Sequence, residues 1–343
     1  MTSIHEAFKL GQSIWLDYID RSMIAGGLQE WIDKGVVGVT TNPSIFENAI
    51  AKKTDYDAEI KSLHQAGKTS AEIYEVLTVQ EVGAAADILR PVYDKTGGKD
   101  GYVSLEVNPL IASDKETTIS EAKRLFALLN RPNVMIKIPA TPEGIEALTE
   151  VIAANVNVNS TLIFSREQYD NVAKAYIEGI KRGGKAQSVA SAFVSRVEAA
   201  VDKELDAKGN SELKGKIAVD GIKLMYQDFK KLFAGMELKQ RPLWASTGTK
   251  SKEYSDVKYV EELIGPDTVN TVPPATLAAF VDHGKAALTL ENGIDKAEAD
   301  VKALKAAGVD LDAVNAKLLA DGLAAFNKSF ESLMAAIESK ANA

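Results

Sequence analysis

The repeated alternation of short apolar strands with helical stretches limits the fold of this chain more than any other feature. The expected strands cover residues 13–18, 36–43, 101–107, 133–140, 155–164, 187–192, 242–246 and 268–272. Strands that alternate with helices favour a parallel sheet. Eight such units in 343 residues, with no linker-like stretch, favour a (β/α)8 TIM barrel over a doubly wound sheet. We therefore expect one α/β barrel domain over residues 1–343, with a helical C-terminal tail over about 285–343.

Local signals predict where several helices lie. Residues 43–94 have helical rather than strand periodicity, and a further helix is expected over 120–130. Thr141 is followed by a proline, which is a helix-start signal. Ser165 and Gln168 have the spacing of a capping box, so another helix is expected to begin there.

One expected strand carries a lysine in an otherwise apolar run. This residue is Lys137, within 133–140. If both faces of the strand are covered, as in a parallel sheet, the amine lies in an apolar slot. Burial favours the uncharged form of an amine, and a neutral amine is a nucleophile toward carbonyl groups. The alternative is an edge-strand lysine that blocks aggregation.

Polar residues gather at the carboxyl ends of the expected strands, where the active site of a barrel lies. Besides Lys137 they are Asp17, Thr40, Asn42, Glu106, Asn159, Thr161, Ser191, Ser246 and Asn270. A buried polar residue costs free energy unless it is paired, so core packing does not explain such a set at one end. Lysine can form a Schiff base, carboxylates can move protons, and Asn and Thr can hold hydroxyl groups. This combination predicts carbonyl chemistry at Lys137.

A phosphate site is expected beyond the sixth strand. Arg196 lies there in the first turn of a helix, shortly after Ser191. Its planar fork matches phosphate oxygens, and the N–H groups of a helix N-terminus add to the attraction. Residues 246–250 form a second loop of small residues, of the kind that lets the backbone approach a phosphate. The alternative for Arg196 is a surface ion pair.

Composition argues against several classes of function. The net charge of −8 disfavours a general nucleic-acid or membrane-surface role. The chain has no cysteine, which excludes disulfides, thiolate catalysis and cysteine metal sites. His5, His64 and His283 lack ligand spacing, so no metal site is expected. Neither a signal peptide nor a bilayer-spanning run is present, so a cytoplasmic location is expected.

Motifs on these strands resemble those of the transaldolases. They are WLD at 15–17, GVTTNPS at 38–44, SLEV at 104–107, MIKIP at 135–139, NSTLIFS at 159–165 and SAFVSR at 191–196. The resemblance spans nearly the whole chain, and the motifs together are highly specific. It implies a barrel of the class I aldolase type in which Lys137 forms the Schiff base.

The resemblance also implies roles for the other residues. Asp17 takes the proton of the substrate C4 hydroxyl as the C3–C4 bond breaks, and Glu106 and Thr161 hold a proton-shuttling water. The implied substrate-binding residues are Thr40, Asn42, Asn159 and Phe193, and the implied phosphate-binding residues are Ser191, Arg196, Ser246 and Lys250. The best-known branch of the family carries an arginine soon after the serine of strand seven. This loop continues to Lys250 instead, so Lys250 is the candidate substitute.

The implied reaction moves a dihydroxyacetone unit from sedoheptulose 7-phosphate to glyceraldehyde 3-phosphate. The products are erythrose 4-phosphate and fructose 6-phosphate, in the pentose phosphate pathway, and no metal or organic cofactor is implied. Two alternatives stay open: a fructose 6-phosphate aldolase, which is shorter and has glutamine and tyrosine at the positions of Glu106 and Phe193, and a non-catalytic barrel that binds sugar phosphates. The tail can pack across the barrel mouth or against a second subunit of a homodimer.

Overall fold

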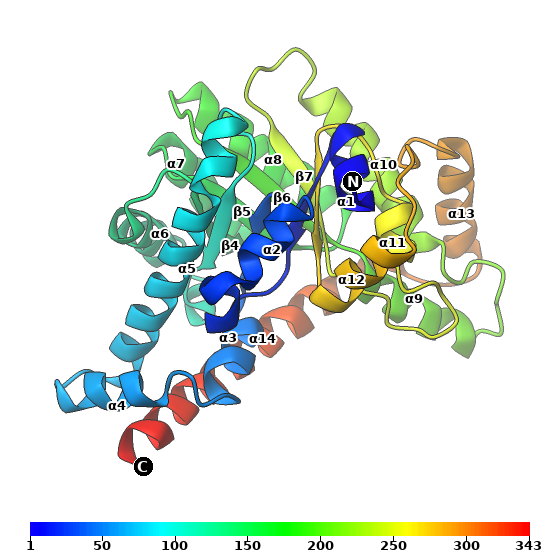
Figure 1. The fold of residues 1–343 in the computed structure, drawn as a ribbon. Helices are drawn as coiled ribbons and strands as arrows, with labels where there is room; N and C mark the ends of the chain where they lie inside the picture. The colour runs from blue at the N-terminus through cyan, green and yellow to red at the C-terminus, as the bar shows by residue number, and fades with distance from the viewer.

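The first and last strands pair with each other, so the sheet closes into a barrel. β1 (Gln12–Leu16) and β8 (Thr268–Val272) are parallel, with Leu16 opposite Val272. The computed structural model describes residues 1–343, with β1 to β8 in sequence order around the ring (Figure 1). The intervening strands are β2 (Gly38–Val39), β3 (Tyr102–Glu106), β4 (Val134–Pro139), β5 (Val158–Ile163), β6 (Ser188–Phe193) and β7 (Gln240–Ala245). The predicted (β/α)8 barrel is confirmed.

Helices follow the strands and surround the barrel (Figure 1). Up to β4 they are α1 (Ser3–Lys9), η1 (Met23–Gly27), α2 (Leu28–Asp33), α3 (Pro43–Phe46), η2 (Glu47–Ala51), α4 (Asp57–Gln65), α5 (Ser70–Lys95), η3 (Pro109–Ile111) and α6 (Lys115–Leu129). After β4 they are α7 (Pro142–Ala153), α8 (Arg166–Lys181), α9 (Ser195–Ala207), α10 (Ile217–Leu232), α11 (Lys258–Glu261), α12 (Pro274–Asp282), α13 (Ile294–Ala306) and α14 (Leu311–Asn342). None of them is both long and apolar enough to cross a bilayer.

The predicted start of α7 at Thr141 is confirmed, but the start expected for α6 is wrong. Thr141 Oγ1 accepts a hydrogen bond from the Gly144 N–H at 3.0 Å and so caps α7. The helix expected over 120–130 begins earlier, at Lys115, because Asp114 accepts a hydrogen bond from the Thr117 N–H at 3.0 Å. The first turn of α6 is polar and lacks apolar periodicity, so the sequence pattern did not indicate that the helix begins there.

The capping box expected at the start of α8 is only half formed. Ser165 Oγ accepts from the Gln168 N–H at 3.0 Å, as a cap should. The Gln168 side chain, however, accepts from the Phe164 N–H at 2.9 Å and donates to the Ala140 carbonyl at 2.7 Å. It therefore ties the ends of β4 and β5 together, which keeps their carboxyl ends in register.

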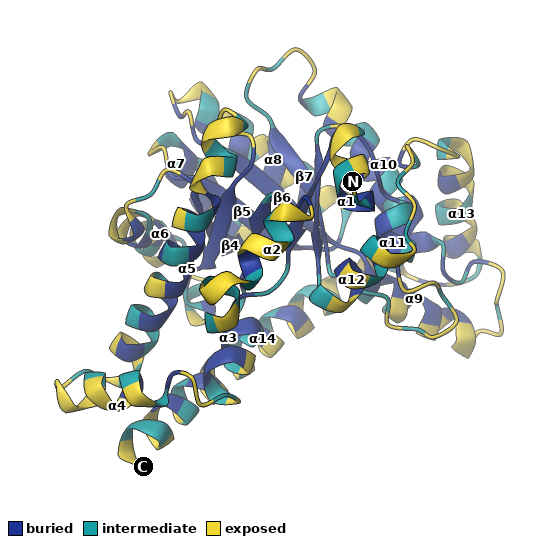
Figure 2. Cartoon of the chain, viewed as in Figure 1, coloured by how far each residue is buried: buried dark blue, intermediate teal, exposed yellow.

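Both faces of the strands are covered. Figure 2 shows the barrel strands as buried and the exposed residues on the outward sides of the helices. Every residue of β4 is buried, and β4 pairs with β3 on one side and β5 on the other. Lys137 is therefore part of the closed wall. The alternative of an edge-strand lysine is wrong.

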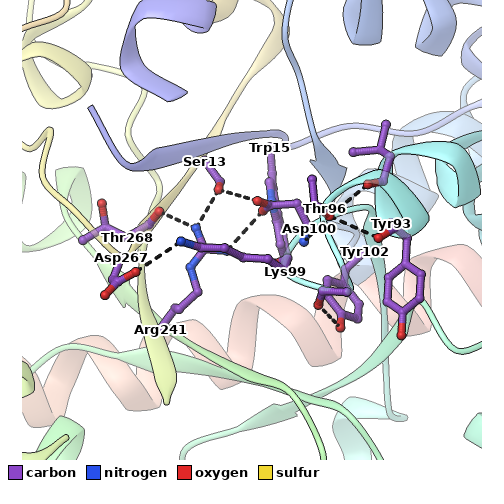
Figure 3. A network of polar contacts seen from close by, with 12 residues as sticks. Ser13, Trp15, Tyr93, Thr96, Lys99, Asp100, Tyr102, Arg241, Asp267 and Thr268 are labelled. Atoms are coloured by element: carbon purple, nitrogen blue, oxygen red, sulfur yellow. Dashed lines mark hydrogen bonds and ion pairs between the residues drawn. The ribbon is translucent and has the colours of Figure 1, made fainter. Parts of the chain in front are cut away.

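A buried polar network closes the amino-terminal end of the barrel (Figure 3). Arg241, at the start of β7, donates to Asp100 Oδ1 at 3.1 Å and to Ser13 Oγ at 2.6 Å. Asp100, fully buried just before β3, also accepts from Trp15 Nε1 at 3.2 Å. One ion pair thus connects β1, β3 and β7 at the end opposite the predicted site.

The C-terminal helix α14 lies across the carboxyl end of the barrel (Figure 1). Ser329 Oγ is 2.8 Å from Ser44 Oγ, just after β2, and Ser332 Oγ donates to Glu47 Oε1 at 2.9 Å. Phe326 is buried on the barrel side of this helix. Of the two positions that the sequence allows for the tail, the structure shows the one across the barrel mouth.

Candidate active site

A cavity of about 190 Å³ lies at the carboxyl end of the barrel, beneath α14. Its lining residues are Asp17, Thr40, Asn42, Ser44, Lys137, Thr161, Ser191, Phe193, Arg196, Ala245, Ser246, Gly248, Lys250, Thr271, Pro273 and Phe326. All of the predicted site residues are among them except Glu106, Asn159 and Asn270. A larger groove of about 600 Å³ between α7, α8 and α14 has no lysine or arginine in its lining, so it is unsuited to a phosphate.

Lys137 presents a buried amine to this cavity from β4. The residue is 4% exposed, and Nζ donates to the Thr41 carbonyl oxygen at 3.1 Å. Nζ lies 3.5 Å from Glu106 Oε2 and 5.8 Å from the centre of the Phe326 ring. The amine is thus fixed by one backbone acceptor and one carboxyl group, and it is shielded from bulk water.

Glu106 stands directly beside Lys137 because β3 and β4 pair with these two residues opposite each other. No hydrogen bond from another protein group reaches either carboxyl oxygen. Burial raises the pKa of Glu106 to about 7, against the opposing effect of the Lys137 charge. A carboxyl group with a pKa near neutrality can both give and take a proton under physiological conditions.

Asp17 faces the same cavity from the end of β1. Its backbone N–H donates to the Val272 carbonyl at 3.0 Å, which extends the β1–β8 pairing by one residue and fixes its position. Burial raises the pKa of the Asp17 carboxyl, and the positive charges of Lys137, Lys250 and Arg196 oppose this rise. Two carboxyl groups with raised pKa values therefore flank one amine.

Asn159 is held in a polar layer beneath the cavity. Its Nδ2 donates to Ser104 Oγ at 3.1 Å, and Ser191 Oγ donates to its Oδ1 at 2.6 Å. By contrast, the hydroxyl oxygens of Thr40 and Thr161 are buried without a hydrogen-bond partner in the protein. Buried hydroxyls are normally paired, so these two are the ones available to a substrate or a water.

Two cationic side chains, Arg196 and Lys250, line one side of the cavity together with Ser246. Arg196 lies in the first turn of α9 and makes no ion pair with any carboxylate, so the surface ion-pair alternative does not hold. Ser195 Oγ is 2.9 Å from Ser246 Oγ, and the Ser195 N–H donates to the Ser246 carbonyl at 3.0 Å. These contacts join the loop after β6 to the loop after β7, which carries Lys250. Arg196 and Lys250 thus line one cavity with Ser246.

Comparison with known proteins identifies the family. The family model described as transaldolase/fructose-6-phosphate aldolase matches residues 14–337. The chain belongs to this family. Transaldolase 1 of Streptomyces avermitilis is 46% identical over 349 residues, covering 95% of this chain and 92% of the relative.

Two other relatives match with similar coverage. The transaldolase of Trichodesmium erythraeum is 44% identical, covering 98% of this chain and 96% of the relative. The transaldolase of Neisseria meningitidis is 43% identical, covering 98% of this chain and 99% of the relative. The predicted family and the enzyme class, a transferase, are confirmed. Membership of the transaldolase family implies sugar-phosphate substrates.

Some features of this transaldolase-family site could not be located from the sequence. Asn270 does not line the cavity: its Oδ1 accepts from Thr247 Oγ1 at 2.8 Å, and the next residue, Thr271, faces the cavity. Phe326 comes from the C-terminal helix. The helical spacing of Gly322, Phe326 and Phe330 marks one face of α14, but nothing in that spacing says which surface the face covers.

Proposed function

We propose that the protein is a transaldolase that carries a dihydroxyacetone unit on Lys137, from sedoheptulose 7-phosphate to glyceraldehyde 3-phosphate. The observation that carries this proposal is the buried Lys137 amine between two carboxyl groups with raised pKa values. An amine of this kind captures a ketone, and its iminium form accepts the electrons of a breaking C–C bond.

In the proposed first stage, the Lys137 amine attacks the ketone carbon of the donor and forms a carbinolamine. Glu106 then gives its proton to the carbinolamine hydroxyl, which leaves as water, and the lysine nitrogen becomes an iminium. The unpaired hydroxyl of Thr161 is available to hold that water. A carboxyl group with a pKa of about 7 suits this step because it starts partly protonated and takes the proton back easily.

In the second stage, Asp17 takes the proton of the C4 hydroxyl while the C3–C4 bond breaks. The bonding electrons move to the iminium and give an enamine on Lys137, and the aldehyde product leaves. The enamine carbon then attacks the aldehyde of the acceptor, and Asp17 returns the proton to the new hydroxyl. Hydrolysis of the resulting iminium, with Glu106 again moving the proton, frees the lysine and the ketose product.

Arg196, Lys250 and Ser246 are proposed to hold the phosphate of donor and acceptor. A guanidinium group gives a phosphate a paired, planar set of donors, and an ammonium group adds a point charge. Ser191 donates its single hydroxyl hydrogen to Asn159 Oδ1 at 2.6 Å, so it must release that bond before it can donate to a phosphate oxygen.

The test is borohydride trapping with mass analysis of the adduct. Fructose 6-phosphate plus borohydride should add a dihydroxyacetone-derived mass at Lys137, and no adduct would indicate a non-catalytic binding barrel. The second candidate, a fructose 6-phosphate aldolase, is included in the family description. It is distinguished by incubation with fructose 6-phosphate alone: a transaldolase should release little free dihydroxyacetone, whereas substantial release without an acceptor would favour the aldolase.

We also propose that the barrel and its helical tail form one domain, because α14 supplies Phe326 to the cavity and bonds to Ser44 and Glu47. A chain that ends at residue 310 should therefore lose activity even if the barrel folds. Full activity in that truncated chain would show that the tail is not part of the catalytic domain.

A further inference from the structure

A second cavity, of about 120 Å³, lies behind Glu106 between the barrel wall and its outer helices. Its lining includes Leu105 and Glu106 of β3, Thr78 of α5, Glu121 of α6 and Phe330 of α14. It shares no lining residue with the cavity of about 190 Å³ that contains Lys137, the main cavity. Glu106 thus lies between the two spaces, with Lys137 on one side and this second cavity on the other.

The carboxyl group of Glu106 has the Lys137 amine as a neighbour, 3.5 Å from Oε2, but accepts no hydrogen bond from the protein. The residue is 5% exposed, and both oxygens lack a hydrogen bond from any protein group. Buried polar atoms are nearly always satisfied by protein or by ordered water. The second cavity has room for water, because each molecule occupies roughly 30 Å³ of liquid, so 120 Å³ holds several.

The residues that line this cavity range from buried to exposed. Thr78 is buried, Tyr74 and Glu121 are half-buried, and Ala71 is exposed. The Thr78 hydroxyl donates to the Tyr74 carbonyl at 2.9 Å, which leaves its lone pairs free to accept from water. At the outer end, the exposed Arg124 pairs with Glu121 at 2.8 Å. Polar lining groups and residues at the protein surface therefore border the same cavity as the buried carboxyl group.

We propose that the second cavity is a water-filled passage through which Glu106 exchanges its proton with bulk solvent while a sugar closes the main cavity. This inference rests on the proposed role of Glu106 in proton transfer at Lys137. When the carbinolamine hydroxyl leaves, Glu106 loses its proton to the departing water. A water in the passage then returns a proton to the carboxylate, and bulk solvent restores that proton along the chain. During hydrolysis of the iminium, a proton moves in the opposite direction, from Glu106 through the waters of the passage to bulk solvent.

The direct test is a crystal structure of the protein at a resolution that orders internal water. A chain of ordered waters should run from Glu106 toward Glu121. A dry cavity would overturn the proposal.

The kinetic test narrows the passage with Ala71→Leu, at its exposed outer end, and with Thr78→Ile, which fills it and removes the hydroxyl. Ala303→Leu, on the exposed side of α13, is the matched control. The first two variants should lower kcat by roughly 10-fold, which is part of the ~10²–10⁴-fold that positioned proton transfer contributes. KM should stay unchanged, and the solvent deuterium isotope effect on kcat should increase. If Thr78→Ile does not fold, Ala71→Leu alone still tests the proposal.

Borohydride trapping separates this proposal from the proposed function. In all three variants the adduct at Lys137 should reach its full extent, and in Ala71→Leu and Thr78→Ile it should form more slowly than in Ala303→Leu. Equal rates of adduct formation in the three would overturn the passage and leave the Schiff-base enzyme standing. Absence of the adduct in the unmodified protein would overturn the enzyme itself, and the passage with it.

Discussion

Glu106 and Lys137 face each other across adjacent strands, with Oε2 3.5 Å from Nζ and both side chains shielded from solvent. Removing two charges from water costs several kcal/mol per ion even after relaxation, so such a pair is weak evidence for stability. The Glu106 carboxyl also accepts no hydrogen bond that would offset this cost. The pair is better explained by the proposed role of Glu106 in proton transfer during the reaction at Lys137 than by the needs of the fold.

Replacing Lys137 by methionine should abolish turnover and leave the protein folded. Methionine matches the stem of lysine and fits an apolar strand. Activity should fall by more than about 10⁴-fold, as when a nucleophile is removed from other covalent enzymes. The measurement is the transfer rate together with a circular dichroism melt. Residual activity within tenfold of the original would show that another group captures the ketone.

Glu106→Gln should slow Schiff-base formation by roughly 10²- to 10⁴-fold, because glutamine keeps the size and removes the proton transfer. The inflection near pH 7 in the rate profile of adduct formation should disappear with it, since burial raises the pKa of Glu106 to about 7. An inflection that persists in the variant would assign that pKa to another group.

The same carboxyl group predicts a pH dependence of stability. Its folded pKa of about 7 is above its ordinary value of 4.5, so the folded protein retains a proton that the unfolded chain has lost. The free energy of unfolding should therefore fall as pH rises between these values, by ~1.4 kcal/mol per pH unit for one group. Denaturant unfolding at pH 5 and pH 7 should show a smaller decrease in Glu106→Gln than in the original protein.

The fold was predictable because each strand and helix has its own local pattern. The strand positions and the set of polar residues at one end followed from that alternation. Three features could not be predicted from local patterns and became visible only in the folded structure. Arg241 and Asp100 are 141 residues apart, and nothing local links them. Asn270 and Thr271 are neighbours in a buried strand, and the sequence does not show which of the two side chains faces the cavity. Phe326 belongs to a helix whose docking surface exists only once the barrel has closed.

Arg196→Gln should mainly raise KM for phosphorylated substrates. A hydrogen bond to a charged group contributes roughly 1.5–3 kcal/mol, which corresponds to a change of about 10- to 150-fold. Arg166→Gln is the matched control: Arg166 occupies the first turn of α8, pairs with Asp228 at 2.8 Å and does not line the main cavity. Unchanged KM in the Arg196 variant would remove this residue from the phosphate site.

Asp100→Asn should destabilise the fold without changing the chemistry, because Asp100 lies at the opposite end of the barrel. It would leave Arg241 buried without its counter-charge, a loss of roughly 3–5 kcal/mol. The exposed pair Arg90–Asp94 gives the comparison, since Asp94→Asn should cost less than about 1 kcal/mol. Urea unfolding measures both, and kcat of the folded Asp100 variant should stay at the original value. Equal midpoints for the two variants would show that Arg241 does not depend on Asp100.

Phe326→Leu should lower the fraction of enzyme held as the Schiff base at saturating substrate. The ring centre is 5.8 Å from Lys137 Nζ, and the iminium places a positive charge at that nitrogen. A cation near an aromatic face is stabilised by about 0.5–2 kcal/mol. Loss of the ring should therefore reduce the ratio of trapped Schiff base to free enzyme by roughly 2- to 30-fold. Phe326→Tyr retains the ring and should restore the trapped fraction. If leucine and tyrosine variants trap equally, Phe326 serves only to keep water out of the cavity.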